Sequence, residues 1–342
     1  MPRITFKPKA VTKRLLAVLP QRAREVLVSR YGLGDSVQKM TLEAIGKKYG
    51  ITRERVRQIE NYGIATIKKS PVYTKEQPAF DELAKQIDAF GGIVAEDDFL
   101  EELNTDEMTM NHIHFLLVIG HAFMRKKEDT HFKHRWFIDE AHADKVHDAL
   151  KNLYASLSDE ELVPESKIIE SFFEHLKDVS AEYRQEELAR RWLGISKKIG
   201  RNPIGEWGVA HSPNITAKRM RDYAFLVIRR HGEPMHFSDV AKAITEVFNK
   251  KAHVATCHNE LIKDKRFVLV GRGLYALSEW GHTSGVVKDV ISSLIKKHGP
   301  LTREEIIDKV LKERYVKDNT IIVNLQNAKY FKKDSQGRYS AS

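Results

Sequence analysis

The sequence contains very little cysteine and no long apolar run. One cysteine, Cys257, occurs in 342 residues, so an internal disulfide is impossible. The apolar stretch LLVIG at 116–120 is much shorter than the roughly 18 apolar residues of a membrane-spanning helix. The amino-terminal residues MPRITFKPKA are basic and lack the apolar core of a signal peptide. We therefore expect a protein of the reducing cytoplasm.

Motifs of enzymes are also missing from the sequence. It contains no phosphate loop, nucleophile elbow or dinucleotide fingerprint. No cysteine and no His-Glu-x-x-His pair accompanies the histidines between residues 112 and 147, so we interpret them as surface and core residues. These histidines are His112, His114, His121, His131, His134, His142 and His147. We expect no catalytic site, no metal and no cofactor.

Positive charge is concentrated at the amino-terminal end. Residues 1–75 hold 17 Lys+Arg and 5 Asp+Glu, a net charge of +12. The remaining 40 basic and 42 acidic residues give −2. Binding to nucleic-acid phosphates needs a basic surface, which the first 75 residues provide. Protein contact is the simpler expectation for the rest of the chain.

The stretch from Thr41 to Lys69 has the pattern of a helix-turn-helix. Thr41 and Thr52 are suitable caps for two helices, and Gly50 suits the left-handed turn between them. Apolar residues repeat at helical spacing on one side of each helix. These residues are Leu42, Ile45 and Tyr49 on the first helix, and Val56, Ile59, Gly63 and Ile67 on the second.

The opposite side of the second helix is rich in side chains that can contact bases. Arginine can donate two hydrogen bonds to guanine, glutamine can pair with adenine, and glutamate can accept from cytosine. A solvated polar face is the alternative interpretation. We predict DNA binding by Thr52, Arg53, Glu54, Arg55, Arg57, Gln58 and Asn61. Candidate phosphate contacts are Thr41, Lys47, Lys48, Lys68 and Lys69.

The segment from Val11 to Lys69 resembles region 4 of housekeeping-type bacterial sigma factors. The resemblance is carried by LPQRAREVLVSRYGL and TLEAIGKKYGITRERVRQIE. It implies that Arg53, Glu54, Arg57 and Gln58 contact the promoter −35 element, that Arg55 lies near phosphate, and that the region docks on the RNA polymerase flap. Tyr62 and Gly63 depart from the family pattern, so we expect the helix to bend or fray after Asn61.

The sigma-like match covers about a fifth of the chain. No segment resembles the sigma regions that melt promoter DNA or clamp the polymerase core. We therefore expect a protein that is not a complete sigma factor.

The rest of the chain shows a weak internal repeat of three helices followed by a hairpin. RRHGEPMHFSDVAKAI aligns with KKHGPLTREEIIDKV, and Ser238 and Thr302 are the expected caps of the second helices. Residues 216–281 resemble the HARE-type winged helix, also found in the delta subunit of bacterial RNA polymerase, through HFSDVAKAI and RFVLVGRGLYALSEWG. Trp136, Trp207 and Trp280 recur near the proposed wings and are expected to pack against the helices.

The predicted fold is mainly α: a helix-turn-helix domain, then three or four winged-helix units with short β-hairpin wings. The expected domains are residues 1–72, 79–140, 141–212 (the most diverged unit), 216–282 and 283–342. Residues 1–10 are expected to form a flexible basic arm, and the segment PVYTKEQP between Pro71 and Pro78 a polar linker. The wing cations are candidate phosphate contacts or solvated residues. They are Lys265, Arg266, Arg272, Lys332, Lys333 and Arg338.

These features support three hypotheses about function. The first is a bacterial-type transcription regulator that binds −35-like promoter DNA and associates with RNA polymerase core, in the cytoplasm at the nucleoid. The second is a polymerase-associated, delta-like scaffold protein without sequence-specific DNA binding. The third is the targeting subunit of a DNA-modifying enzyme, for which the sequence holds no nuclease-like acidic constellation. None of the three requires a membrane or a small-molecule substrate.

Overall fold

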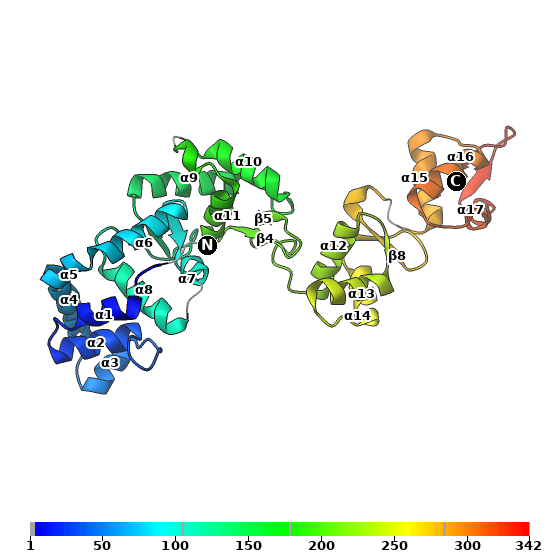
Figure 1. Cartoon of the computed structure of the whole chain (residues 1–342). Helices are drawn as coiled ribbons and strands as arrows, with labels where there is room; N and C mark the ends of the chain where they lie inside the picture. The colour runs from blue at the N-terminus through cyan, green and yellow to red at the C-terminus, as the bar shows by residue number, and fades with distance from the viewer. Residues whose placement is uncertain (1–3, 104–105, 178, 283–284, 342) are drawn as a thin grey trace. The chain divides into compact units, whose positions relative to one another are not determined.

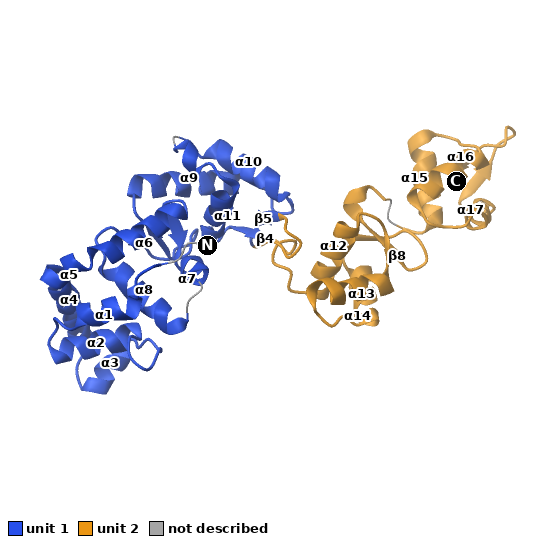
Figure 2. Cartoon of the chain, in the orientation of Figure 1, with its two compact units in different colours: residues 1–200, 207–210 blue, residues 201–206, 211–342 orange. Residues whose placement is uncertain are grey.

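The computed structural model describes residues 4–103, 106–177, 179–282 and 285–341. These residues form a mainly helical chain with small antiparallel sheets, which confirms the predicted class (Figure 1). The chain divides into unit 1, residues 1–200 and 207–210, and unit 2, residues 201–206 and 211–342 (Figure 2). In the described part, no helix has the length and apolar content needed to cross a membrane. The five finer domain boundaries stay a prediction, and the one expected at 283 lies outside the described residues.

Four helices begin unit 1, and the first starts inside the segment expected to be a flexible arm. They are α1 (Pro8–Leu16), α2 (Gln21–Tyr31), α3 (Leu42–Tyr49) and α4 (Arg53–Lys69). Residues 1–3 of that arm lie outside the described residues. From there the expectation is wrong, because the Thr5 hydroxyl donates to Glu82 (2.8 Å) and Pro8 opens α1. Proline suits a first helical position, where its missing N–H has no partner to lose.

The proline-bracketed segment at 71–78 is helical, so the expected linker is also wrong. It forms α5 (Pro71–Lys75) and the start of α6 (Gln77–Ala89). Both prolines occupy first turns, where they are compatible with a helix. The Tyr73 side chain is 5% exposed. Its hydroxyl donates to the carbonyl of Ile119 (3.0 Å) and accepts from the N–H of His121 (3.1 Å), which fixes α5 against the carboxy-terminal end of Glu107–Ile119 within unit 1.

A single hydrophobic core joins the first helices to the next part of unit 1. The next elements are β1 (Ile93–Ala95), α7 (Glu96–Glu102), α8 (Glu107–Ile119), β2 (Met124–Lys126) and β3 (Arg135–Phe137), with the antiparallel strand order β1-β3-β2. The core runs from Val11 on α1 to Trp136 on β3. The Asn111 amide on α8 donates to the carbonyls of Gly32 (3.2 Å) and Val37 (2.8 Å). Helices α1 and α2 and the loop after α2 are therefore packed directly against α8.

The last part of unit 1 is mainly helical. Its elements are α9 (Glu140–Ser156), α10 (Glu165–His175), the 3-10 helix η1 (Ala181–Tyr183), α11 (Glu186–Ile195), β4 (Ile199–Arg201) and β5 (Trp207–Val209). A second core gathers around the fully buried Phe172 and Trp192. The Trp192 indole donates to the carbonyl of Gly91 (3.2 Å), which ties α11 to the turn before β1.

Unit 2 contains the expected three-helix and hairpin sequence twice. The first copy is α12 (Met220–His231), β6 (Met235–His236), α13 (Phe237–Phe248), α14 (Val254–Lys263), β7 (Phe267–Leu269), β8 (Leu274–Leu277) and η2 (Ser278–Trp280). The second is α15 (Val287–His298), α16 (Arg303–Glu313), α17 (Asp318–Leu325), β9 (Phe331–Lys333) and β10 (Tyr339–Ala341). Helices and hairpins are confirmed at these positions, and their assignment to the winged-helix class stays a prediction.

The caps of the second helices agree with the prediction in one copy only. Thr302 caps α16 and exchanges hydrogen bonds with Glu305, as a capping box does. The predicted cap of α13, Ser238, is wrong. The helix begins at Phe237, and the His236 ring accepts from the N–H of Ser238. A histidine nitrogen thus takes the capping role that hydroxyl and carboxyl side chains usually have.

Candidate nucleic-acid interface

Local sequence signals fix the turn between α3 and α4. The Thr41 hydroxyl accepts from the N–H of Ala44 (3.1 Å), and the Thr52 hydroxyl accepts from the N–H of Arg55 (3.2 Å). Gly50 ends α3 with φ of 65°, the left-handed conformation predicted for it. The two helices and α2 share a small core of Val26, Ile45 and Val56. Both caps and the turn are therefore confirmed.

A glycine that the sequence did not single out sets the distance between α3 and the turn. A Cβ added at Gly46 would lie 2.6 Å from the carbonyl oxygen of Ile51. Such a contact is impossible without moving backbone, so this close approach requires glycine.

Helix α4 runs without interruption from Arg53 to Lys69, so the expected fraying after Asn61 is wrong. Gly63 is buried, and a Cβ added there would lie 3.1 Å from Leu27 Cδ1. The glycine thus lets α4 approach α2 closely. Packing of this kind outweighs the cost of about 1 kcal/mol for a glycine within a helix.

The predicted base-contacting side chains form one exposed surface on the first turns of α4. All seven are exposed to solvent: Thr52, Arg53, Glu54, Arg55, Arg57, Gln58 and Asn61. They belong to adjacent turns of one helix, so the structure brings them together. We call this set the α4 face.

Two internal contacts order the α4 face. The Arg57 guanidinium donates two hydrogen bonds to the Glu54 carboxylate (2.7 and 2.9 Å). These bonds lower the pKa of Glu54, which keeps its charge. Arg55 donates to the side-chain oxygen of Gln58 (3.1 Å). Both pairs lie at the solvent-exposed surface, where such contacts are weak and can be exchanged for other partners.

The five candidate phosphate residues are not all near the α4 face. Thr41, Lys47 and Lys48 are exposed on α3 or at its start, and Lys47 pairs with Glu43 (3.2 Å). Lys68 and Lys69 lie at the far end of α4, about 22 Å from Arg53 at 1.5 Å per residue. Lys68 is half-buried, and burial lowers its pKa.

The structure adds residues that position α4 and that the sequence pattern did not indicate. Glu60 is 9% exposed, accepts from the Tyr31 hydroxyl (2.9 Å) and lies 3.5 Å from Arg30 Nε. Burial, with the Glu60 charge as a second cause, raises the pKa of Tyr31. Arg22 lies over the ring of Tyr49 at the end of α3, with its guanidinium carbon 3.9 Å from the ring centre. These contacts join residues 27 to 30 positions apart, so no local pattern could reveal them.

The histidines between 112 and 147 occupy separate environments. His142 contacts the carbonyl of Gly91 (2.9 Å), and His147 accepts from Arg135 Nε (2.7 Å). Burial lowers the pKa of His114 and of His147 to about 4, so both rings are neutral near pH 7. The described residues contain no group of three His, Cys, Asp or Glu side chains able to hold a metal ion.

Two of the three tryptophans near the hairpins, Trp136 and Trp207, pack into cores that include helices, as expected, whereas the partly buried Trp280 contacts a hairpin. Trp136 belongs to the first core and Trp207 to the second, and Trp280 packs against the β7–β8 hairpin. Two of the indoles also donate to glutamates, Trp136 to Glu96 (2.8 Å) and Trp207 to Glu165 (3.2 Å).

The wing cations of unit 2 differ in whether their charged groups are free to bind phosphate. Arg266 donates to Asp222 (2.9 Å), Asp264 (2.7 Å) and Asn214 (2.9 Å). Its hydrogen-bonding capacity is used inside the unit, so Arg266 fits neither the expected phosphate contact nor the alternative of a solvated residue. The other candidates are exposed: Lys265, Arg272, Lys332, Lys333 and Arg338.

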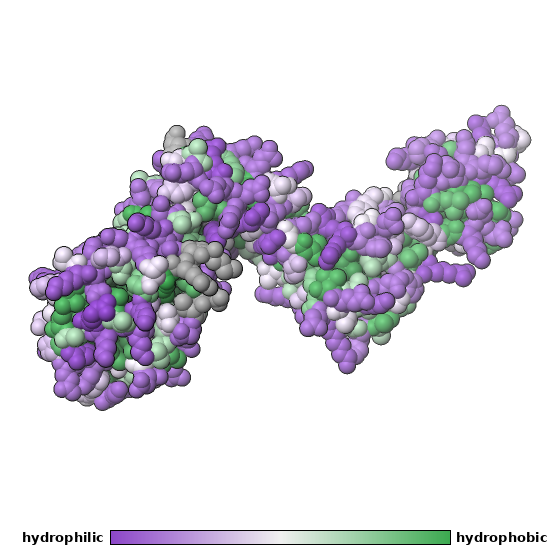
Figure 3. All heavy atoms as spheres, in the orientation of Figure 1, coloured by the Kyte–Doolittle hydropathy of each residue, from purple (hydrophilic) through white to green (hydrophobic). Residues whose placement is uncertain are grey.

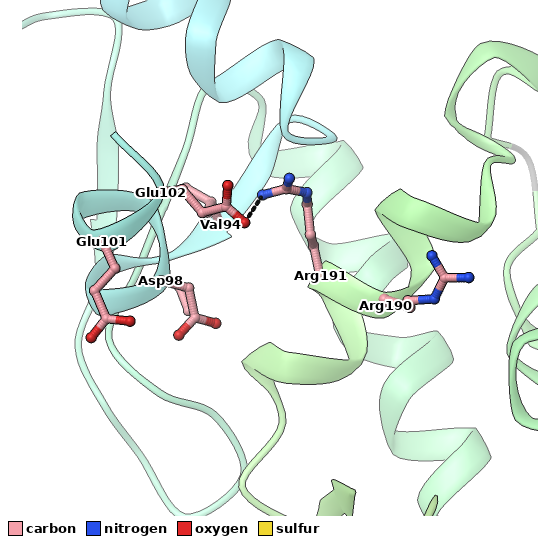
Figure 4. Close-up of a pocket in the computed structure, with 7 residues that line it drawn as sticks. Val94, Asp98, Glu101, Glu102, Arg190 and Arg191 are labelled. Carbon is pink, nitrogen blue, oxygen red and sulfur yellow. Dashed lines mark ion pairs between the residues drawn. The ribbon is translucent and has the colours of Figure 1, made fainter. Parts of the chain in front are cut away.

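A pocket of about 530 Å³ in unit 1 lies between α7 and α11 (Figure 4). Carboxylates of α7 and arginines of α11 line it together with β1. Arg191 pairs with Glu102 (3.1 Å) within the pocket, and Arg190 pairs with Glu165 (2.8 Å) outside its lining. The charges of the wall are thus largely matched within the protein.

Residues 15–69 match the family described as Sigma-70, region 4. A sigma factor RpoS of Coxiella burnetii is 56% identical over 48 residues, which are 14% of this chain and 13% of that protein. The principal sigma factor HrdD of Streptomyces viridifaciens is 42% identical over 55 residues, 16% of each chain. The sigma factor RpoD of Helicobacter pylori is 45% identical over 65 residues, 19% of this chain and 10% of that protein.

The amino-terminal part of the chain is thus a sigma-70 region 4 domain. The chain spans at most 16% of the length of these three relatives. The matched residues include α2, α3 and α4 with the whole α4 face, so the family match and the exposed polar surface coincide.

Proposed function

We propose that this protein is a transcription factor of bacterial type that binds −35-like promoter DNA through the α4 face and associates with RNA polymerase. The observation that carries the proposal is the coincidence of the region 4 match with the seven exposed polar side chains of the α4 face. On DNA, Arg53 and Arg57 bind guanine edges, Gln58 binds adenine, and Glu54 accepts from cytosine. The Glu54–Arg57 pair is exchanged for these base contacts, and Arg55 turns to phosphate.

We further propose that the protein acts beside a complete sigma factor and not as one, without catalysis or a cofactor, in the cytoplasm at the nucleoid. A transcription assay with core polymerase and this chain alone is expected to give no specific starts. The remaining units are proposed as winged helices of the HARE and delta-subunit type. Their support is the repeated order of three helices and a hairpin, with Phe267 opposite Leu277 in one copy and Phe331 opposite Ala341 in the other.

A specific observation supports protein contact by the middle of the chain. Residues 76–200 hold 15 Lys+Arg and 27 Asp+Glu, a net charge of −12. A surface of this charge repels DNA phosphates and suits a basic protein surface. It favours polymerase association, and it also keeps the scaffold hypothesis open as the second candidate function.

The first test is binding of the purified chain to a duplex containing a −35 element and to a scrambled duplex, at about 50 and 200 mM salt. The variant is Arg57→Ala/Gln58→Ala. The matched control is Lys85→Ala, which also removes one positive charge, from an exposed position on α6. Each lost bidentate contact is worth about 1–3 kcal/mol of base discrimination, so the double variant is expected to lose preference for the −35 duplex by roughly 30-fold or more.

Two outcomes separate the candidate functions. A −35 preference that the double variant lacks and Lys85→Ala keeps supports base readout. Equal binding of both duplexes by the unaltered chain refutes it. Arg57→Glu is then compared in a pull-down with core polymerase, where retained polymerase binding without promoter preference identifies the scaffold function.

A further inference from the structure

The chain beyond residue 75 is not evenly charged. Its net charge of −2 hides two opposite regions, because residues 211–342 hold 24 Lys+Arg and 14 Asp+Glu, a net charge of +10. All of these residues belong to unit 2. Unit 2 therefore has a net positive charge comparable to that of residues 1–75. In the sum over all residues beyond 75, the acidic residues of unit 1 cancel this positive charge.

The two hairpins of unit 2 have equivalent registers and opposite surface chemistry. In the first hairpin Val268 pairs with Ala276 and Leu269 with Tyr275. Val268, Val270 and Ala276 are buried in a small cluster against which Leu274 and Trp280 pack. The neighbouring Arg266 is bound to Asp222 and Asp264. The apolar side chains on one face of this hairpin thus pack inside the unit, and the arginine before its first strand forms ion pairs inside the unit.

In the second hairpin lysines replace the apolar pair. Lys332 lies opposite Ser340 and Lys333 opposite Tyr339, the positions held by Val268 and Leu269 in the first hairpin. Both lysines are exposed, and neither is within 4 Å of a carboxylate in the described chain. The hairpin tip is hydrophilic in Figure 3.

Two further cations lie next to these strands. Lys329, two residues before β9, is exposed. Lys288 of α15 lies over the ring of Tyr330, with Nζ 4.4 Å from the ring centre. We call Lys288, Lys329, Lys332 and Lys333 the basic hairpin cluster.

We propose that the basic hairpin cluster is a second nucleic-acid contact, which binds the phosphates of duplex DNA without sequence preference. Lysine ammonium groups are compact charges that suit phosphate. Their binding releases counterions and so gives affinity to any duplex. The proposal goes beyond the function assigned to the α4 face and does not depend on base readout there.

Duplex DNA fits the cluster better than single strands do. Proteins that bind single strands stack bases on exposed aromatic side chains. Here Tyr330 and Tyr339 are only half-exposed, and both pack against the core of the carboxy-terminal copy. The exposed groups are therefore charges without a stacking surface.

The test measures affinity of the full chain for a scrambled duplex, without a −35 element, over a series of salt concentrations. The variant is Lys332→Ala/Lys333→Ala. The matched control is Lys296→Ala/Lys297→Ala, which removes the same charge from two exposed adjacent positions at the end of α15. Each phosphate contact contributes about 0.9 to the slope of log affinity against log salt, so the variant slope is expected to fall by about 1.8. The control slope is expected to stay within about 0.5 of the unaltered chain.

Equal slopes for variant and control overturn the proposal, because net charge alone would then explain binding. Tighter binding of a single strand of the same length also overturns the duplex assignment. A variant that keeps its DNA affinity and loses core polymerase in a pull-down shows a protein surface instead. Both variants change exposed side chains, and unaltered circular dichroism and melting temperature verify that the fold is intact.

Discussion

The hydroxyl of Tyr73 offers a sharp test of how the region 4 domain is attached to the chain. Tyr73→Phe removes only the oxygen that joins α5 to the end of α8. The Ile119 carbonyl is buried and loses its side-chain donor, whereas His121 is exposed and its N–H can turn to water. Net hydrogen bonds are worth about 1 kcal/mol, and a buried unpaired group costs about 1–3 kcal/mol. We expect the free energy of unfolding of unit 1 to fall by about 1–2 kcal/mol.

The assay is thermal and urea unfolding of the full chain, followed by circular dichroism. For a unit of this size, 1 kcal/mol corresponds to about 2–4 °C, so the transition of unit 1 should move down by roughly 2–8 °C. Tyr62→Phe is the control, because Tyr62 is 57% exposed on α4. If both variants melt at the same temperature, segment 71–78 is not held by this contact and the argument for a packed α5 fails.

Two further predictions concern the stability of unit 1. Gly46→Ala should destabilise it by about 2 kcal/mol or more in urea unfolding, because the new Cβ meets the Ile51 carbonyl at 2.6 Å. In Gly194→Ala the new Cβ meets only the end of the Asp98 carboxylate at 3.4 Å, so this variant should be neutral or more stable by up to about 1 kcal/mol. A larger loss of stability in Gly194→Ala than in Gly46→Ala would contradict the packing. The pKa of His147 is about 4 in the folded chain and 6.5 in the unfolded chain. Between these two pH values the unfolded chain therefore binds more protons than the folded chain. The free energy of unfolding should fall as the pH falls from 6.5 toward 4. His147→Gln keeps a side-chain acceptor for Arg135 and should reduce this dependence in unfolding measured across that pH window, while the contribution of His114 remains; an unchanged slope would refute the assignment.

The helix-turn-helix could be predicted from sequence because its signals are local. The caps at Thr41 and Thr52 each bond a backbone N–H three residues away, and Gly50 needs only its own backbone conformation. Such interactions are encoded within a few residues, so spacing and residue type suffice. The repeated helices and hairpins of unit 2 were predictable for the same reason.

The errors arose where distant contacts decide the structure. Two prolines and polar neighbours resemble a linker, but Tyr73 is fixed by residues 46 and 48 positions away. Gly63 would weaken an isolated helix, and close packing on Leu27 compensates for it. Arg266 is held by Asp222, 44 residues earlier, in addition to the nearby Asp264. Long-range pairing of this kind leaves no periodic trace in one sequence.

The short connection between α4 and α5 has a consequence for the geometry of DNA. Ser70 alone separates the helices, ending α4 and capping α5. Because α5 is itself fixed to α8, the α4 face and the rest of unit 1 turn together, without a hinge at this point. On a promoter, a protein bound to unit 1 would be held on one side of the double helix. Its contacts should then depend on helical phase: about 5 added base pairs between the two DNA sites should disrupt them, and about 10 should restore them.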